Sequence, residues 1–119
     1  MTFLEMVLLM IAAHAYFDYA GQGDFMAKAK NHAVPIPGVP WYQPLTAHAA
    51  IHGGAVGLIT GSVWFGLAEF VVHWITDHLK CHGMISYNTD QAVHVACKVI
   101  WAAAYVALAD QLANGGLGL

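Results

Sequence analysis

The sequence predicts an all-α fold, a four-helix transmembrane bundle with up-down topology. Hydrophobic residues make up 59% of the 119 residues and charged residues only 9%, whereas an ordinary soluble domain carries about 25% charged residues. The run over residues 99–109, VIWAAAYVALA, has no charge on any helical face, although a soluble bundle needs a polar outer face on each helix. We therefore expect one membrane-embedded helical domain over residues 1–119. A soluble bundle is the alternative, because the mean hydropathy is only +0.57.

The first two helices are predicted over residues 2–21 and 44–60. A helix of about 20 residues spans roughly 30 Å, which is the thickness of the hydrocarbon layer. The first apolar run has no basic residue before it and contains His14 and Asp18, so we interpret it as a retained helix and not as a cleaved signal peptide. Pro44 suits the first turn of the second helix, where its missing N–H costs nothing.

The third and fourth helices are predicted over residues 62–80 and 89–113. Gly61 stands between the second and third helices and marks a tight connection between them. Asn88 is the expected N-cap of the fourth helix, because Gln91 follows three residues later, at the position that a capping box uses. The sequence thus predicts where each of the last two helices begins.

Two longer connections, residues 22–43 and 81–88, emerge on the same side of an up-down bundle. The first is a long proline-rich loop, and its prolines favour an extended backbone. Trp41 and Tyr42, just before the second helix, suit a membrane interface. Because lysines gather on this side, the positive-inside rule predicts that it is cytoplasmic and that both termini are outside. These lysines are Lys28, Lys30 and Lys80.

Four pairs of polar residues carry the candidate chemistry, and the two members of each pair are four residues apart. Residues at this spacing project from the same face of a helix. The pairs lie near the C-terminal ends of the first and third helices and towards the N-terminal ends of the second and fourth. An up-down bundle therefore gathers them in one layer near the cytoplasmic surface. The pairs are His14 and Asp18, His48 and His52, His73 and Asp77, and Asp90 and His94.

A metal ion explains this layer better than four isolated hydrogen-bonding pairs do. A single polar pair in a membrane helix often only bonds to a neighbouring helix, but several carboxylates in a low-dielectric layer repel one another. Lysines are too few to neutralise them, with only Lys98 inside a helix. A bound cation resolves the repulsion. Imidazole and carboxylate ligands suit a divalent transition metal such as zinc, manganese or iron, and also nickel.

The candidate groups outnumber the ligands of one tetrahedral ion. Either two ions bind, or some groups form an outer shell that orients the ligands. The predicted metal ligands are His14, Asp18, His48, His73, Asp77, Asp90 and His94. The residues predicted to orient them or to contact a substrate are Gln22, His52, Glu69, Gln91 and Lys98. A small zinc site at His78, Cys81 and His82 is conceivable, but the cluster lacks paired CxxC spacing, so we expect surface residues there.

Other features bear on partners. The chain has no arginine and a formal charge of −3, so we do not expect it to bind nucleic acid. Cys81 and Cys97 alone do not form a disulfide framework. Gly54 and Gly57 begin and end the stretch GAVG, a spacing of small residues that favours close helix packing. The glycine-rich second helix is therefore the surface through which a homo-oligomer would form.

The combined pattern of a HxxxDxxxQ motif, a loop lysine, a histidine in the second helix, HxxxDxxK and DQxxH resembles that of a family of small bacterial and phage membrane proteins of unknown function. It appears here as HAYFDYAGQ, Lys30, His48, HWITDHLK and DQAVH, and it covers nearly the whole chain. The resemblance implies a multi-pass protein of the bacterial inner (cytoplasmic) membrane. More distantly, the chain is similar to membrane-bound metal-dependent hydrolases, which implies metal-assisted hydrolysis of a lipid-like ester or phosphoester.

Three functional hypotheses remain open. The first is a metal-dependent hydrolase near the cytoplasmic membrane face, where a metal activates water, Asp77 or Asp90 acts as general base, and membrane lipid is the partner. The second is a non-enzymatic phage or bacterial membrane protein, with an envelope-modifying or exclusion role and a structural metal or polar network. The third is a haem-binding bundle, which the carboxylate beside nearly every histidine disfavours.

Overall fold

The computed structural model describes residues 1–115, and within this range every regular element is helical. The prediction of an all-α fold is therefore confirmed for the described residues, while residues 116–119 of the predicted domain lie outside them. The helices are α1 (Phe3–Ala15), the π-helical segment η1 (Tyr16–Ala20), α2 (Gly23–Ala29), α3 (Tyr42–Thr60), α4 (Val63–Cys81) and α5 (Tyr87–Ala113).

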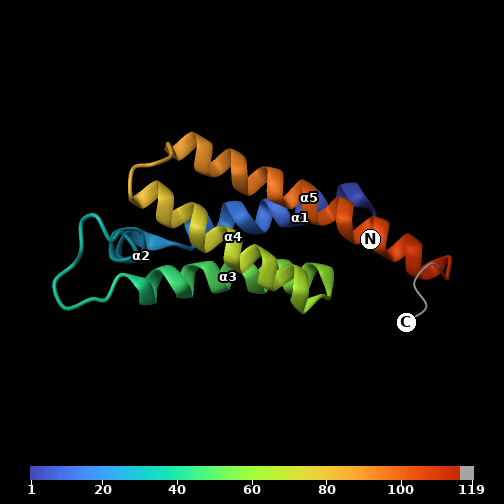
Figure 1. The fold of residues 1–119 in the computed structure, drawn as a ribbon, viewed down its shortest axis with the longest axis horizontal. Coiled ribbons are helices and arrows are strands. Elements are labelled where there is room, and N and C mark those ends of the chain that lie inside the picture. Colours follow the sequence, from blue (N-terminus) through green and yellow to red (C-terminus); the bar gives the residue numbers. More distant parts are fainter. Residues whose placement is uncertain (116–119) are drawn as a thin grey trace.

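The four long helices run up and down along the length of the molecule (Figure 1). The end of η1, the start of α3, the end of α4 and the start of α5 lie at one end, together with α2 and the two longer connections. The N-terminus and the turn between α3 and α4 lie at the other end. The described chain is elongated, with extents of 55 × 26 × 24 Å. The end with the connections is called the loop end below.

The end of α3 and the start of α5 show how local capping sets the helix bounds. Gly61 has a φ of 66° and ends α3 in the left-handed conformation that glycine tolerates best, as the predicted tight connection requires. The start of α5 differs from the prediction, because Ser86 and not Asn88 is its N-cap. The backbone N–H of Thr89 donates to Ser86 Oγ over 3.0 Å, which satisfies one of the free donors of the first turn. The helix therefore begins at Tyr87.

The predicted proline-rich loop over residues 22–43 is only partly a loop. Its first third forms the short helix α2 (Gly23–Ala29), because the prolines that favour extended backbone are confined to the second half, VPIPGVP. Lys30 follows directly as the C-cap of α2 and is only 3% exposed. This connection therefore places the side chain of Lys30 inside the bundle.

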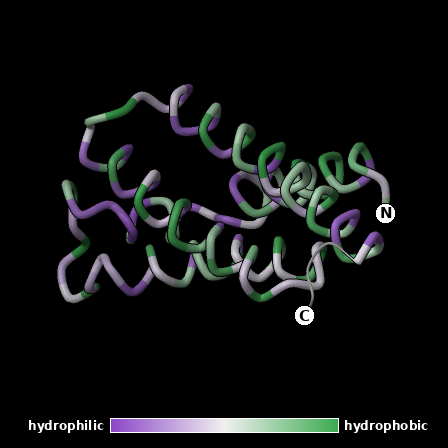
Figure 2. The backbone as a smooth tube through the Cα atoms, turned by 45° about the vertical axis from the view of Figure 1, so that its right-hand side comes forward, coloured by the Kyte–Doolittle hydropathy of each residue, from purple (hydrophilic) through white to green (hydrophobic). Residues whose placement is uncertain are grey.

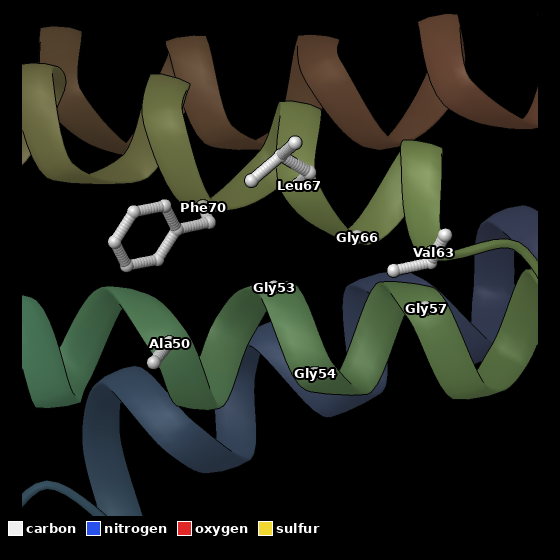
Figure 3. Close-up of a pocket in the computed structure, with 8 residues that line it drawn as sticks. All are labelled: Ala50, Gly53, Gly54, Gly57, Val63, Gly66, Leu67 and Phe70. Carbon is white, nitrogen blue, oxygen red and sulfur yellow. The ribbon is translucent and has the colours of Figure 1, made fainter.

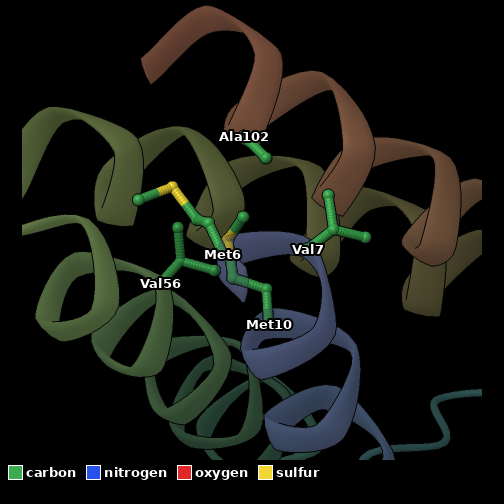
Figure 4. Close-up of a cluster of buried hydrophobic side chains, with 5 residues drawn as sticks. All are labelled: Met6, Val7, Met10, Val56 and Ala102. Atoms are coloured by element: carbon green, nitrogen blue, oxygen red, sulfur yellow. The ribbon is translucent and has the colours of Figure 1, made fainter. Parts of the chain in front are cut away.

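A small apolar core lies in the half of the bundle away from the loop end (Figure 4). It joins α1, α3 and α5 through side chains that are almost fully buried. In the described residues, buried polar or charged side chains outnumber buried hydrophobic ones, twelve against eight, so the rest of the interior is polar. The residues of this core are Met6, Val7, Met10, Val56 and Ala102.

Helices α3 and α4 form a hairpin whose backbones touch at two glycines (Figure 3). A Cβ on Gly53 would lie 2.6 Å from the carbonyl oxygen of Gly66, and a Cβ on Gly66 would lie 2.7 Å from that of Gly53. Only glycine fits at either position without moving a helix. Of the glycines expected to allow close packing, Gly54 points into open space instead.

Two helical stretches are long and apolar enough to cross a membrane, Phe3–Ala20 and Tyr87–Ala113. The prediction of four transmembrane helices is therefore supported in part, for the first and last helices. Helices α3 and α4 are less apolar because each carries a set of polar residues in its inward face, and Figure 2 shows these hydrophilic positions between hydrophobic stretches. Most of their outward side chains are apolar, with Leu58 86% and Trp64 75% exposed, although Gln43 and Thr46 of α3 are exposed and polar.

Candidate metal centre

The four polar pairs predicted from their spacing lie in one layer within the bundle. One pair comes from α1 and η1, and one each from α3, α4 and α5. All of these side chains except that of Asp18 are at most 4% exposed, and the side chain of Asp18 is 8% exposed. The structure therefore brings together, within the layer, His14, Asp18, His48, His52, His73, Asp77, Asp90 and His94.

Asp18 is the centre of the layer. Its Oδ1 atom lies 3.1 Å from Nε2 of His48, 2.9 Å from Nε2 of His52 and 3.7 Å from Nε2 of His73. Asp18 belongs to the π-helical segment η1 (Tyr16–Ala20). π-Helical turns are rare and occur frequently at functional sites. This departure from α-helical geometry sets the position of the carboxylate that the histidines surround.

The histidine rings of the layer stack on one another. The ring centroids of His52 and His73 are 3.8 Å apart and those of His73 and His94 are 4.1 Å apart, each pair with an interplanar angle of 17°. Within the described residues, neither ring nitrogen of His73 has a hydrogen-bond partner, and Nε2 of His52 and Nδ1 of His14 also lack one. Each buried polar atom without a partner destabilises the folded state by about 1–3 kcal/mol. Several such atoms lie together in this layer, so their combined destabilisation is large.

Lysines neutralise Asp77 in the layer and Glu69, which adjoins the layer at His73. Asp77 lies between Lys30, at 2.6 Å, and Lys80, at 3.0 Å. Glu69 accepts from Lys98 Nζ over 2.5 Å and from the indole of Trp101. The expectation that lysines are too few was therefore wrong for Asp77, because a loop lysine and a lysine at the end of α4 both reach it.

The burial of Lys30 also changes the argument for orientation. The positive-inside rule counts lysines in the loops that flank a membrane, but Lys30 is paired inside the bundle and Lys80 is mostly buried, with 22% of its side chain exposed. Lys28 is the one of the three that is exposed. The predicted cytoplasmic placement of the loop end thus has less support than the sequence suggests.

Asp18 and Asp90 are neutralised less well than Asp77 and Glu69. Within 4 Å of its carboxylate, Asp18 has imidazoles and the amide of Gln91 but no lysine among the described residues. Asp90 lies 3.1 Å from Nε2 of His94, and its nearest lysine is Lys80 at 3.8 Å. Asp18 and Asp90 are therefore the carboxylates of the layer that retain the most negative charge for a bound cation.

Buried histidines and carboxylates form three overlapping groups that could hold a metal ion. In each group, the atoms that could bind the ion lie within 4.8 Å of one another. His52 and Glu69, which we expected to have outer roles, belong to such groups, whereas two predicted ligands, His14 and Asp77, belong to none of them. The groups are Asp18 with His48, His52 and His73, Glu69 with His73 and His94, and Asp18 with Asp90 and His94.

The other predicted residues have supporting contacts. Gln91 donates to Oδ2 of Asp18 over 2.8 Å, and its Oε1 lies 3.0 Å from Nε2 of His14, as an orienting residue should. Gln22 accepts from Lys30 and donates to the backbone carbonyl of Asp18, so it positions the lysine. Lys30 itself was missing from the predicted site, and its only sequence signal was the loop lysine of the family pattern.

A second group of aromatic residues lies outside the layer, where we expected only surface residues. The rings of His32 and His78 stack with centroids 4.2 Å apart, and Nε2 of His32 lies 2.8 Å from Nδ1 of His82. Trp41 and Trp74 stack on His78. Cys81, which we had grouped with these histidines, instead has its sulfur 3.9 Å from Oδ1 of Asp77. Both cysteines are free thiols.

Comparison of the chain with protein-family models, with curated proteins and with solved structures found no match in any of the three. The arguments for function therefore rest on the residues and geometry of this layer.

Proposed function

We propose that the protein is a membrane-embedded metal-binding protein whose ion is held by Asp18, His48, His52 and His73. The observation that carries the proposal is the set of buried imidazole nitrogens without a hydrogen-bond partner, above all both nitrogens of His73. A metal ion turns such a nitrogen into a ligand. Three imidazoles and one carboxylate match the ligand types that zinc, iron and manganese take in proteins.

The contact between His52 and Asp18 supports the same proposal. Nε2 of His52 lies 2.9 Å from Oδ1 of Asp18, yet this ring nitrogen has no hydrogen-bond partner. Two ligands of one tetrahedral ion are about 3.3 Å apart and point at the ion instead of at each other. Proximity without a hydrogen bond is therefore the relation expected of two atoms that share an ion.

We also propose that all four long helices lie in the membrane, including α3 and α4. Most of their large exposed side chains are apolar, as for Leu58, Val63 and Trp64, while their carboxylates and all their histidines except the half-buried His78 are buried. A soluble protein has the opposite distribution, whereas intramembrane ionisable residues face the interior of a bundle. The resemblance stated above adds the bacterial inner membrane as the location.

Hydrolysis of a lipid-like ester or phosphoester is the activity that this ligand set supports best. A divalent ion in such a site supplies water activated near neutral pH. Asp77 is a poor general base, because two ammonium groups already occupy its carboxylate. Asp90 is the better placed of the two predicted bases, since it joins Asp18 through the amide of Gln91.

The two alternatives are distinguished by specific observations. Haem binding requires a gap between helices for the macrocycle, but the ring of His73 stacks on those of His52 and His94, with centroids 3.8 Å and 4.1 Å apart, which disfavours it. A structural metal without catalysis has the same ligands as the hydrolase. Only an activity measurement separates these two functions.

The test is metal analysis of the purified protein in detergent, followed by an assay. We expect at least one equivalent of zinc, manganese or iron, which His73→Ala loses while its helical circular dichroism is unchanged. The matched control is His32→Ala, which removes a histidine outside the layer and should keep the metal. Folded wild-type protein that neither contains nor takes up these ions would refute the proposal. Metal-loaded protein that hydrolyses neither phospholipid vesicles nor nitrophenyl esters and phosphodiesters would favour the structural role.

A further inference from the structure

The carboxylate of Asp18 presents its two oxygens to different residues. Oδ1 faces His48, His52 and His73 on α3 and α4. Oδ2 faces the opposite wall, where it accepts from Gln91 on α5 and lies 3.4 Å from Nε2 of His14. A carboxylate with ligand sets on both of its oxygens has the arrangement of a bridging ligand.

The second ligand set lies on α5. Asp90 and His94 form a group with Asp18 in which the three ligand atoms lie within 4.8 Å of one another. Nε2 of Gln91 donates to Oδ2 of Asp18 over 2.8 Å and to Oδ2 of Asp90 over 3.2 Å. An electropositive amide group thus joins two buried carboxylates that would otherwise repel each other. The position between Asp18 and Asp90 favours positive charge.

The remaining group, Glu69 with His73 and His94, is a poorer site. Both oxygens of Glu69 have donors, the ammonium of Lys98 and the indole N–H of Trp101. An ion there would have to displace a buried ammonium from its partner. On Asp18, which the other two sets share, no ammonium has to be displaced, and an ion at Oδ2 displaces only the neutral amide of Gln91.

We propose that the layer holds two divalent ions, with Asp18 bridging them. The first ion is bound by Oδ1 of Asp18 and by the three histidines named in the proposed function, on which this inference rests. The second ion is bound by Oδ2 of Asp18 together with Asp90 and His94. In this two-ion centre Asp90 is a ligand of the second ion, and this role replaces the general-base role that a one-ion centre leaves to it. Because lysines already neutralise Asp77 and Glu69, two ions leave an excess of positive charge.

The excess of positive charge favours the binding of an anionic ligand between the two ions. Paired ions about 3.5–4 Å apart stabilise both the attacking and the leaving oxygen in phosphoryl displacement. The substrate class that fits such a centre is a phosphoester, in preference to a neutral carboxylic ester. Inorganic phosphate should therefore strengthen the binding of the second ion.

The experiment is titration of metal-free protein in detergent with Mn²⁺, followed by calorimetry and electron paramagnetic resonance. We expect two equivalents and a spin-coupled signal, with tighter binding of the second equivalent in phosphate. The variants His48→Ala and His94→Ala should each retain one equivalent and lose the coupling. Asp18→Asn should also lose the coupling. If His94→Ala does not fold, as judged by circular dichroism, His94→Gln takes its place.

The outcomes separate the inference from the proposed function. One equivalent in the wild-type protein would overturn the two-ion centre and leave the proposed function intact, whereas no bound ion would overturn both. Two uncoupled ions would also contradict the inference, because bridged ions interact. The control is the double variant His32→Ala/His82→Ala, which removes the close histidine pair at the loop end. Loss of the second equivalent in that variant would place the ion there and refute the bridge.

Discussion

Replacing Gly53 by alanine tests whether the approach of α3 and α4 is as close as the structure has it. The added Cβ would lie 2.6 Å from the carbonyl oxygen of Gly66 and 2.9 Å from Cβ of Phe70, whereas ordinary contacts begin at about 3.4 Å. Both neighbours are backbone or backbone-attached atoms, so no side-chain rotation relieves the contact. The helices would have to separate by several tenths of an ångström.

The expected magnitude is the difference of two effects. Alanine gains about 1 kcal/mol over glycine in a helix, and overpacking of a tight interface costs about 1–3 kcal/mol or more. We expect Gly53→Ala to lower the free energy of unfolding by about 1–2 kcal/mol. Gly54 is the matched control, because a Cβ there meets no atom within 4 Å. Gly54→Ala should raise the free energy by about 0.5–1 kcal/mol.

The assay is thermal unfolding in one detergent, followed by circular dichroism. In a chain of this size, 1 kcal/mol corresponds to about 4 °C in Tm, so the two variants should differ by roughly 10 °C. Gly53→Ala should also weaken metal binding, since His52 is its neighbour in sequence and faces Asp18. Equal Tm values for the two variants, or a Gly53→Ala protein more stable than the wild type, would refute the close approach.

Three further predictions concern the loop end. Ser86→Ala should lower the free energy of unfolding by about 1 kcal/mol, and Asn88→Ala should change it by less than about 0.5 kcal/mol. Denaturant titration measures both values. A larger loss in Asn88→Ala than in Ser86→Ala would restore Asn88 as the N-cap. Lys30→Met should lower the free energy of unfolding by about 3 kcal/mol, because it removes one partner of a buried ion pair. Lys28→Met should leave the free energy of unfolding unchanged. Equal effects of the two substitutions would argue against the buried pair. Burial, and then two neighbouring histidines, lower the pKa of His32. Near its pKa the folded chain therefore binds fewer protons at this ring than the unfolded chain does. The free energy of unfolding that His32 contributes should be lost as the pH falls below about 6.5. An NMR titration should place its midpoint below that of the unfolded chain, and an unshifted midpoint would contradict the packing of this ring.

The sequence predicts the long helices well because their signals are local. Apolar runs end at glycine, proline and polar segments, and for three of the four predicted helices both the start and the end fall within about two residues of those observed. The first helix is the exception, since a π-helical turn replaces its last α-helical turn. The i, i+4 spacing of each pair is also local, and the up-down order of the helices was enough to anticipate their common depth.

The remaining features depend on contacts between distant residues. Lys30 and Asp77 are 47 positions apart, and no pattern around Lys30 distinguishes it from Lys28, which stays exposed. Asp77 contacts two lysines and belongs to none of the metal groups, while His52 belongs to one. Gly66 lies opposite Gly53 only because of the register of the hairpin. Such pairings require the fold and cannot be derived from spacing.

On the proposed membrane placement, the unequal lengths of the helices decide how far each helix extends across a bilayer. Helix α5, with 27 residues, is about 40 Å long, whereas the 19 residues of α4 span about 28 Å. Figure 1 shows α5 continuing past the turn between α3 and α4. If the hairpin matches the hydrophobic thickness, the last turns of α5 project beyond the hydrocarbon, and Asp110 lies among headgroups or water. Helix α5 then accommodates the mismatch between its length and the hydrocarbon thickness by tilting or protruding. A change in bilayer thickness would therefore change the tilt or protrusion of the helix that carries Asp90 and His94.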